Sequence, residues 1–454
     1  MRAGNYSTFL VRLMLWLPAK KELKPFRRVR RLTGRVLLLL FLLFGLGAAS
    51  VPPEHALLVQ VDQVTAPYRF DFVNWESEAV ASEIWRRIVP PALPETETGQ
   101  RALVDKFLKA EQNRHHLKQQ LNQLYATCPL VDQPACSGQT ESQIAALEQQ
   151  LTALVATQKQ LLPQVETILS RQEETILKEE GFTVAGHAFP PVAFRLIDPP
   201  TALILSPRDR IEKEDYVGLQ PGLSIEQRVQ IENKLDQRGD VSSYVTDVGG
   251  LGSYPTMVVT SDSLTWLTDV IAHEWTHNYL YTFPSNIAWG YQTYPRLTTI
   301  NETTADIVGA EIGRKVIMRY YPEWIDQLPP LDKTGQPVPA KPSPFDLAMR
   351  RIRQQVDRLL VEGKIDQAEA YMEAERVKLV QQGYTLRKLN QAYFAFHGAY
   401  ATSPASIDPI GPQLRQLRAA SPTLKSFLQR VAWLNSYDDY QAWLTEAGLN
   451  QPSD

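Results

Sequence analysis

The sequence predicts an α+β protein, in which a small mixed β-sheet and two site-bearing helices are flanked in the chain by other helices. Three observations predict this class. Segments before residue 181 and after residue 344 are rich in helix formers. Short β-type runs bounded by glycine and proline lie between residues 181 and 260. Residues 36–53 are uncharged and apolar, which predicts one transmembrane helix before the folded body.

The N-terminal region predicts a membrane anchor. Residues 1–35 hold ten Lys and Arg side chains and one acid, and residues 36–53 are just long enough to cross a bilayer as a helix. Because the basic residues precede the apolar ones, we expect a cytoplasmic tail, a single-pass signal anchor and a body on the extracytoplasmic side. The alternative is a cleaved signal peptide, since Ala48, Ala49 and Ser50 supply small residues for a cleavage site.

The charge of the remaining chain limits its partners. Residues after Arg35 include 37 basic and 49 acidic side chains, a net charge of −12. An acidic body of this kind argues against a nucleic-acid partner. The expected membrane contact is through residues 36–53, and residues 54–95 form a juxtamembrane segment.

Residues 96–180 predict a helical, coiled-coil-like hairpin. Apolar residues recur at steps of three and four in both arms, as in amphipathic helices. The loop between the arms contains Cys128 and Cys136, which suit one disulfide in an exported body, although two free thiols are the alternative. Pro163 is expected to kink or interrupt the second arm. Such a hairpin offers a surface for a protein partner.

Residues 181–325 are expected to form the functional core, with the sheet first and two helices after it. One helix is predicted between the β-type runs at residues 225–237, and the two site-bearing helices at about 264–283 and 298–321. A proline-rich linker follows at residues 326–344. Residues 345–454 are helix-forming and predict a helical C-terminal lobe, with the substrate between this lobe and the sheet.

The first site-bearing helix contains the sequence His273-Glu274-Trp-Thr-His277. Residues four apart lie on one face of a helix, so the two imidazoles can bind one metal ion. Glu274 lies beside them, where its carboxylate can reach a water molecule at the metal. A core helix with two hydrogen-bonded histidines is the alternative interpretation.

The second site-bearing helix contains Asn301-Glu302-Thr-Thr-Ala-Asp306. A catalytic zinc ion takes three protein ligands and keeps a fourth position open, and a carboxylate is the usual partner of two histidines. We therefore expect His273, His277 and Glu302 to bind Zn²⁺. Asp306, one turn after Glu302, is placed to accept a hydrogen bond from a ligand histidine and orient it. A solvated acidic helix face is the alternative.

These two motifs resemble those of the gluzincin metallopeptidases, the thermolysin-like clan. The resemblance covers about 60 residues and implies that Glu274 acts as general base and Asp306 orients a ligand histidine. It also implies a sheet edge that pairs with an extended peptide, for which residues 249–259 stand in the right place unless their glycines form only a turn. The expected function is hydrolysis of peptide bonds in a peptide or protein substrate.

The residue that stabilises the oxyanion of peptide hydrolysis is less clearly indicated. The clan often uses Tyr or His for this purpose, which makes His397 and Tyr400 the candidates in the C-terminal lobe. Tyr291 and Tyr294, between the two motifs, are alternatives. The competing function is a non-catalytic envelope scaffold with a structural or vestigial metal site. Such a scaffold would have no use for the unligated carboxylate of Glu274.

Overall fold

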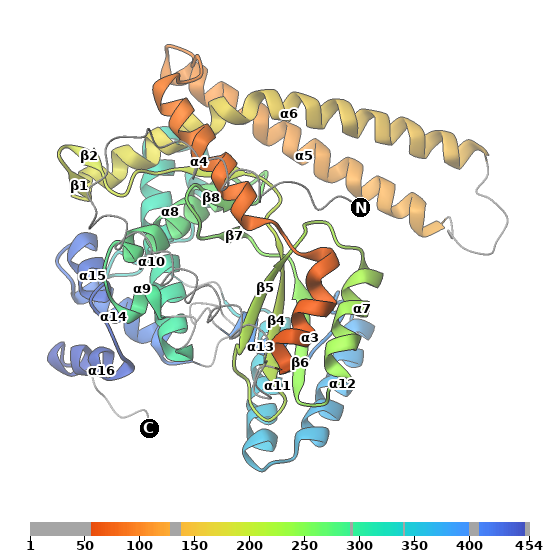
Figure 1. Ribbon diagram of the computed structural model, residues 1–454. Coiled ribbons are helices and arrows are strands. Elements are labelled where there is room, and N and C mark those ends of the chain that lie inside the picture. Colours follow the sequence, from red (N-terminus) through yellow and green to blue (C-terminus); the bar gives the residue numbers. More distant parts are fainter. Residues whose placement is uncertain (1–55, 128–137, 291–293, 339–340, 399–407, 450–454) are drawn as a thin grey trace, which may run out of the picture. The chain divides into compact units, whose positions relative to one another are not determined.

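The computed structural model describes residues 56–127, 138–290, 294–338, 341–398 and 408–449 (Figure 1). Residues 64–454 belong to one compact unit, and helix α3 (Ala56–Thr65) is the first described element of the chain. The class is α+β, as predicted. Within the described part of the chain, no helix is long and apolar enough to cross a bilayer. The predicted anchor, residues 36–53, lies outside that part, and so do Cys128 and Cys136.

Helix α4 (Phe72–Ile88) follows the short 3₁₀ turn η2 (Ala66–Tyr68) and begins where the Asp71 side chain accepts a hydrogen bond from the backbone N–H of Asn74. Its inner face carries the buried Glu83, which pairs with Arg86 of the same helix and with Arg195 of strand β3 (Phe194–Leu196). The network continues from Arg86 to a carboxylate of the hairpin, that of Glu166. These charges therefore fix α4 against the body.

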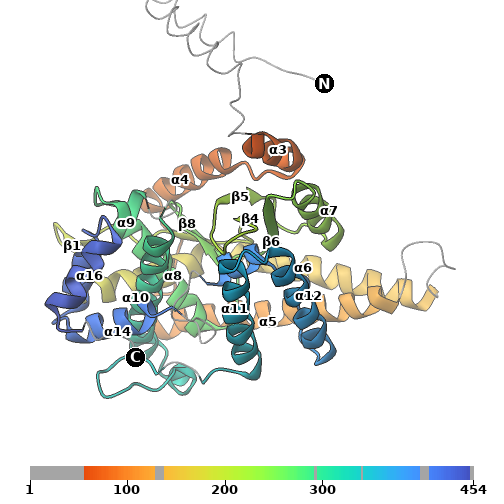
Figure 2. The same cartoon turned by 90° about the horizontal axis from the view of Figure 1, so that it is seen from below.

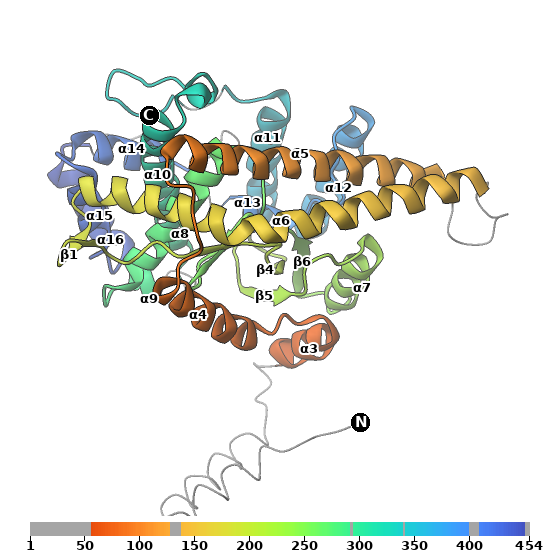
Figure 3. The ribbon, with the colours of Figure 1, turned by 90° about the horizontal axis from the view of Figure 1, so that it is seen from above.

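Helices α5 (Glu97–Thr127) and α6 (Gly138–Glu179) form the predicted hairpin and lie side by side (Figure 3). Helix α6 continues through Pro163 without interruption, which corrects the expected break. The base of the hairpin is not a separate domain. Phe107 and Ile168, both fully buried, belong to the same apolar core as the helices that carry the motifs. The hairpin therefore shares its core with the site.

The strands between residues 181 and 260 form more than the single sheet expected. Strand β4 (Thr201–Pro207) lies between β5 (Asp215–Leu219) and β6 (Val241–Thr246), and all three are antiparallel. In a second sheet, β3 pairs in parallel with β8 (Thr256–Val258), and β8 pairs with the edge strand β7 (Gly250–Leu251). Strands β1 (Thr183–Val184) and β2 (His187–Ala188) form a small hairpin. Residues 249–259, for which the sequence left a strand and a turn open, thus contain two strands, β7 and β8.

Helices α7 (Ile225–Asp236), α8 (Leu264–Tyr281) and α10 (Pro295–Tyr320) confirm the three helices predicted in the core. Ser224 closes a capping box at the start of α7, and the Ser263 side chain accepts a hydrogen bond from the N–H of Trp266 at the start of α8. Pro295 occupies the first turn of α10, where its missing N–H costs nothing. Helix α9 (Asn286–Trp289) connects α8 with α10.

Helices α8 and α10 approach each other closely at two glycines of α10. A Cβ atom on Gly309 would lie 2.5 Å from the backbone oxygen of Asp269, and one on Gly313 would lie 2.2 Å from a carboxylate oxygen of the same residue. Both distances are too short for a side chain. The absence of side chains at these positions therefore sets the separation of the two helices.

The C-terminal residues do not form one lobe, which corrects the predicted lobe at residues 345–454 (Figure 2). Helices α11 and α12 enclose their own apolar cluster, in which Ile352 and Met372 are fully buried, and α13 packs on β4 and β6. Helices α14 to α16 instead join the main core through residues such as Phe427 and Tyr440. The bounds after α10 are η3 (Pro322–Gln327), α11 (Pro344–Val361), α12 (Ile365–Gln381), α13 (Gln391–His397), α14 (Ile410–Ala420), α15 (Leu424–Val431) and α16 (Tyr437–Glu446).

Candidate metal centre

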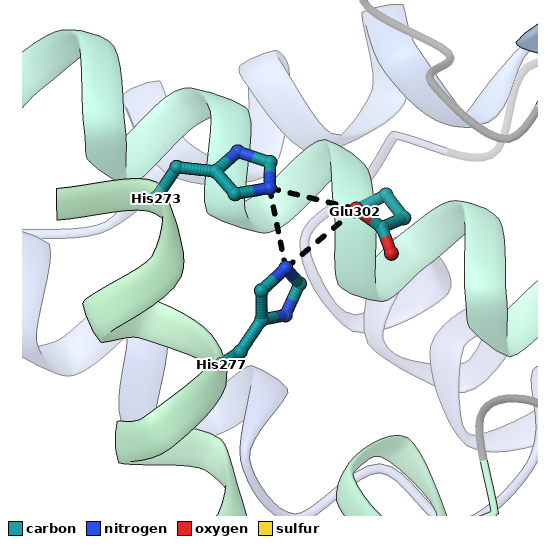
Figure 4. Close-up of side chains that lie close together, drawn as sticks. All are labelled: His273, His277 and Glu302. Carbon is teal, nitrogen blue, oxygen red and sulfur yellow. Dashed lines mark hydrogen bonds and ion pairs between the residues drawn. The ribbon is translucent and has the colours of Figure 1, made fainter. Parts of the chain in front are cut away.

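Helix α8 presents both histidines of the first motif on the face directed toward α10 (Figure 4). Their Nε2 atoms are 3.2 Å apart. His277 is buried, and the side chain of His273 is only 12% exposed. The four-residue spacing therefore has the effect predicted for it, because one helical turn brings the two ring nitrogens to a common point.

Helix α10 adds the third group. The carboxylate oxygen Oε2 of Glu302 lies 3.5 Å from Nε2 of His273 and 3.6 Å from Nε2 of His277. Four bonds of about 2.1 Å in a tetrahedron separate the ligand atoms of zinc by about 3.4 Å. The three measured separations are close to that value. These residues could thus hold a zinc ion with one position left for another ligand, and among the described residues they form the group that could bind a metal, called here the metal-binding group.

Asp306 lies one turn after Glu302 and contacts the other nitrogen of His273, with Nδ1 and Oδ1 3.0 Å apart. A carboxylate in this position holds the histidine ring in the tautomer whose Nε2 lone pair can bind a metal. Burial opposes a charge on His273, but hydrogen bonds with Asp306 and Glu302 outweigh it and raise the pKa of this imidazole. The groups around the ring therefore stabilise a positive charge at this position.

The pKa of Glu302 reflects the same two opposing effects, burial and neighbouring charges. Burial opposes its charge, yet the neighbouring His277 and His273 outweigh burial and lower the pKa of the carboxyl well below its usual range. Three carboxylates, those of Glu274, Glu302 and Asp306, surround two imidazoles. This excess of negative charge in a buried place matches a divalent cation.

Glu274 is 6% exposed, and its Oε2 atom has no hydrogen-bond partner among the described residues. Burial raises the pKa of its carboxyl, although His277 and His273 oppose this rise. A buried oxygen without a partner costs free energy unless a bound group satisfies it. The carboxylate reaches the strand β7, where a Cβ on Gly250 would lie 2.2 Å from Oε1 of Glu274.

A cavity of about 290 Å³ opens beside these groups. Strand β7 and its neighbouring glycines form one wall, the metal-binding group forms another, and the end of α13 contributes Ala395 and Phe396. The remaining wall comes from the β4–β5 region, with Ile204, Lys213 and Tyr216. The cavity therefore offers space for a substrate next to the metal-binding group.

The structure separates His397 and Tyr294 from this cavity. The His397 ring packs against Tyr393, with centroids 4.2 Å apart, and against Tyr244, and it is not among the residues that line the cavity. Tyr294 is 50% exposed at the start of α10. Tyr291 and Tyr400 lie outside the described residues.

Lys213 and Tyr216 line the cavity but were not predicted as site residues. Burial lowers the pKa of Lys213, while the charge of Glu302 opposes that change. Burial and the charge of Glu274 raise the pKa of Tyr216 to about 12. Residues 215–219, which form strand β5, were not among the segments singled out in the sequence, so nothing there indicated a cavity.

Comparisons of the chain with protein-family models, with curated proteins and with solved structures found no match.

Proposed function

We propose that this protein is a zinc-dependent peptidase of the gluzincin type that its two motifs resemble. The observation that carries the proposal is the arrangement of four buried groups from two helices. His273, His277 and Glu302 have the separations of three zinc ligands, and Glu274 lies beside them with a carboxylate oxygen that no other described residue uses. A site with a purely structural metal ion has no need of that fourth group.

Zinc bound by these residues supplies a Lewis acid that polarises a substrate carbonyl and lowers the pKa of a water molecule. Glu274 accepts a proton as the water oxygen bonds to the carbonyl carbon. When the C–N bond breaks, Glu274 returns this proton to the amine nitrogen. The buried position of Glu274 raises its pKa and makes its carboxylate a better proton acceptor than an exposed one.

The substrate proposed for the site is an extended peptide. Strand β7 is at the edge of its sheet, since β8 is its only partner in that sheet, and its residues line the cavity beside Glu274. An edge strand presents free backbone groups that can pair with an added strand. Backbone pairing of this kind would place a peptide bond next to Glu274 without dependence on particular side chains.

We also propose that residues 36–53 anchor the protein in a membrane, with the body on the extracytoplasmic side and the basic tail in the cytoplasm. An apolar outward face on α4, early in the described chain, supports a place next to a bilayer. Val73 is 79% exposed, Trp85 is 63% exposed and Ile88 is 68% exposed. Apolar side chains gathered on one face usually mark a contact surface.

Replacement of Glu274 by Gln tests the peptidase. The amide cannot accept a proton, and positioned proton transfer contributes about 10²- to 10⁴-fold to the rate. The three proposed ligands are untouched, so the variant should still bind one zinc ion per chain. We expect cleavage of a mixed peptide library by the wild type, read as new termini by mass spectrometry, and loss of that cleavage in Glu274→Gln at equal zinc content.

Glu302→Gln is the matched control, because it makes the same chemical change one helix away. This variant should lose zinc, whereas Glu274→Gln should keep it. Equal cleavage by the wild type and Glu274→Gln would refute the role of the carboxylate. Zinc binding without any cleavage by the wild type would support the scaffold with a structural metal site instead.

A further inference from the structure

Tyr216 lines the cavity, and its hydroxyl oxygen is buried without a hydrogen-bond partner among the described residues. A buried hydroxyl costs free energy unless it is hydrogen-bonded. In contrast, the hydroxyl of Tyr321, buried elsewhere in the same molecule, contacts the side chain of Gln172 at 2.9 Å. Unlike that of Tyr321, the Tyr216 hydroxyl has a donor that no described residue uses.

The sheet determines where this hydroxyl points. Tyr216 of β5 and Tyr244 of β6 are both register partners of Ile204 on the central strand, so the three side chains share one face of the sheet. Ile204 and Tyr216 line the cavity, whereas Tyr244 packs against Tyr393 and His397. Two tyrosines in one row of the sheet thus have different environments, and only Tyr216 faces the metal-binding group.

Tyr216 and Glu274 line the same cavity. The negative charge of Glu274 acts on its hydroxyl and, together with burial, raises the pKa of Tyr216 to about 12. The hydroxyl therefore stays protonated at neutral pH and can donate a hydrogen bond. A carbonyl attacked by water next to Glu274 develops its negative charge in the same cavity.

We propose that Tyr216 is a catalytic residue that donates a hydrogen bond to the oxyanion formed during peptide hydrolysis. This inference rests on the proposed peptidase function. In this step the water oxygen bonds to the carbonyl carbon, a water proton passes to Glu274, and the carbonyl electron pair moves onto its oxygen. Tyr216 stabilises that oxygen and keeps its own proton. The C–N bond then breaks, and Glu274 protonates the amine.

Other donors in the cavity fit this role less well. Burial lowers the pKa of Lys213, and the charge that opposes this change is that of the proposed ligand Glu302, not that of Glu274. Trp266 precedes His273 by seven residues on α8, which is about 10 Å along a helix. His397, the candidate from the sequence, is turned into an aromatic cluster.

The test compares Tyr216→Phe with Tyr244→Phe in the zinc-loaded full chain. Each variant removes one hydroxyl from the same row of the sheet. For Tyr216→Phe we expect unchanged zinc content, nearly unchanged KM and a kcat reduced about 10²- to 10³-fold, as for loss of one oxyanion donor. Binding of a phosphinic peptide, which mimics the tetrahedral oxyanion, should weaken in calorimetry. Tyr244→Phe should match the wild type in all four measurements.

Three results would overturn the assignment. If the wild type cleaves peptides and Tyr216→Phe does so equally well, Tyr216 is not the donor, although the peptidase proposal stands. If Lys213→Met lowers kcat selectively while Tyr216→Phe does not, the donor is Lys213. If the zinc-loaded wild type cleaves nothing and ignores the phosphinic peptide, the peptidase function fails and the role of Tyr216 fails with it.

Discussion

Glu173 of helix α6 is a second buried acid near the site helices, and unlike Glu274 it does not line the cavity beside the site. It is fully buried, and neither of its carboxylate oxygens has a hydrogen-bond partner among the described residues. Burial, followed by the negative charge of Asp269, raises the pKa of Glu173 well above its usual range. The folded protein therefore holds this side chain in its protonated, neutral form.

This protonation makes stability depend on pH. A raised pKa in the folded state stabilises the fold fully below the unfolded value of about 4.3, and the contribution is lost as pH rises through the folded pKa. Glu173→Gln removes the titration and keeps the shape. As the pH rises from 5 to 8, we expect the variant to gain stability relative to the wild type, by about 1.4 kcal/mol for each pH unit below the folded pKa of Glu173.

Urea denaturation of both proteins at pH 5 and pH 8 measures this difference. The measurement at pH 5 is the control. At this pH the difference in stability between the two proteins comes mainly from the change in packing, and titration of Glu173 contributes less. The same difference in unfolding free energy at both pH values would mean that Glu173 does not bind its proton more tightly in the folded state.

At the scale of elements, the pair of helices α8 and α10 determines the geometry of the proposed metal centre. Each helix contributes proposed ligands, and the separation of the two helices is set where Gly309 and Gly313 meet Asp269. A side chain at Gly309 would push α10 away from α8, and Glu302 and Asp306 would move with it. The ligand geometry is thus determined in part by two glycines that supply no ligand of their own.

Gly309→Ala should therefore weaken zinc binding as well as stability. Overpacking costs about 1–3 kcal/mol, and the displacement should lower zinc affinity measured by competition with a chelator. Ala310→Gly, one residue later in α10, is the matched control. It lowers helix propensity by about 1 kcal/mol without inserting atoms between the helices. It should destabilise the protein and leave zinc affinity unchanged, so equal zinc affinities in the two variants would contradict this view.

The helices that carry the site were predictable because their signals are local. Ser224 and Ser263 cap the helices that they precede, Pro295 lies in the first turn of α10, and the ligand spacing follows from helix geometry alone. The start of α10 was placed three to four residues too late, since the threonines that resemble a cap lie inside the first turns. Pro163 was misjudged because neighbouring contacts of α6 stabilise the helix on both sides of it.

At the scale of the whole molecule, the main core extends well beyond the region predicted to contain it. Helices α5, α6 and α14 to α16 contribute buried side chains to the apolar cluster of α8 and α10. The sequence suggests residues 181–325 as the functional core. Much of the apolar surface of this segment is therefore covered by helices that lie outside it. The compact unit includes residues 64–454.

A fragment of residues 181–325 should not fold by itself. Its buried leucines and isoleucines would face water, so we expect no cooperative thermal transition and strong binding of the dye ANS, as in molten globules. A fragment of residues 64–454 should unfold cooperatively and bind zinc. If circular dichroism shows cooperative unfolding of the short fragment, residues 181–325 fold without the other helices, which would contradict this expectation.

The parts that could not be predicted depend on contacts between distant residues. Strand β3 pairs with β8 rather than with the adjacent β4, which divides the strands into separate sheets. The C-terminal helices are alike in sequence pattern but belong to two apolar clusters. Tyr216 escaped notice for the same reason, because a strand residue becomes a site residue only when the sheet is placed over the metal-binding group.

Gly250 gives the metal centre a signature that can be recognised in other chains. Its φ angle is not among the positive ones, so backbone conformation does not demand glycine there. Space does, because a Cβ would lie 2.2 Å from Oε1 and 2.8 Å from Cδ of Glu274. Position 250 and position 274 are thus coupled. Related chains that keep the glutamate should keep the glycine, and chains that have lost the glutamate are free to change it, so the two positions should vary together.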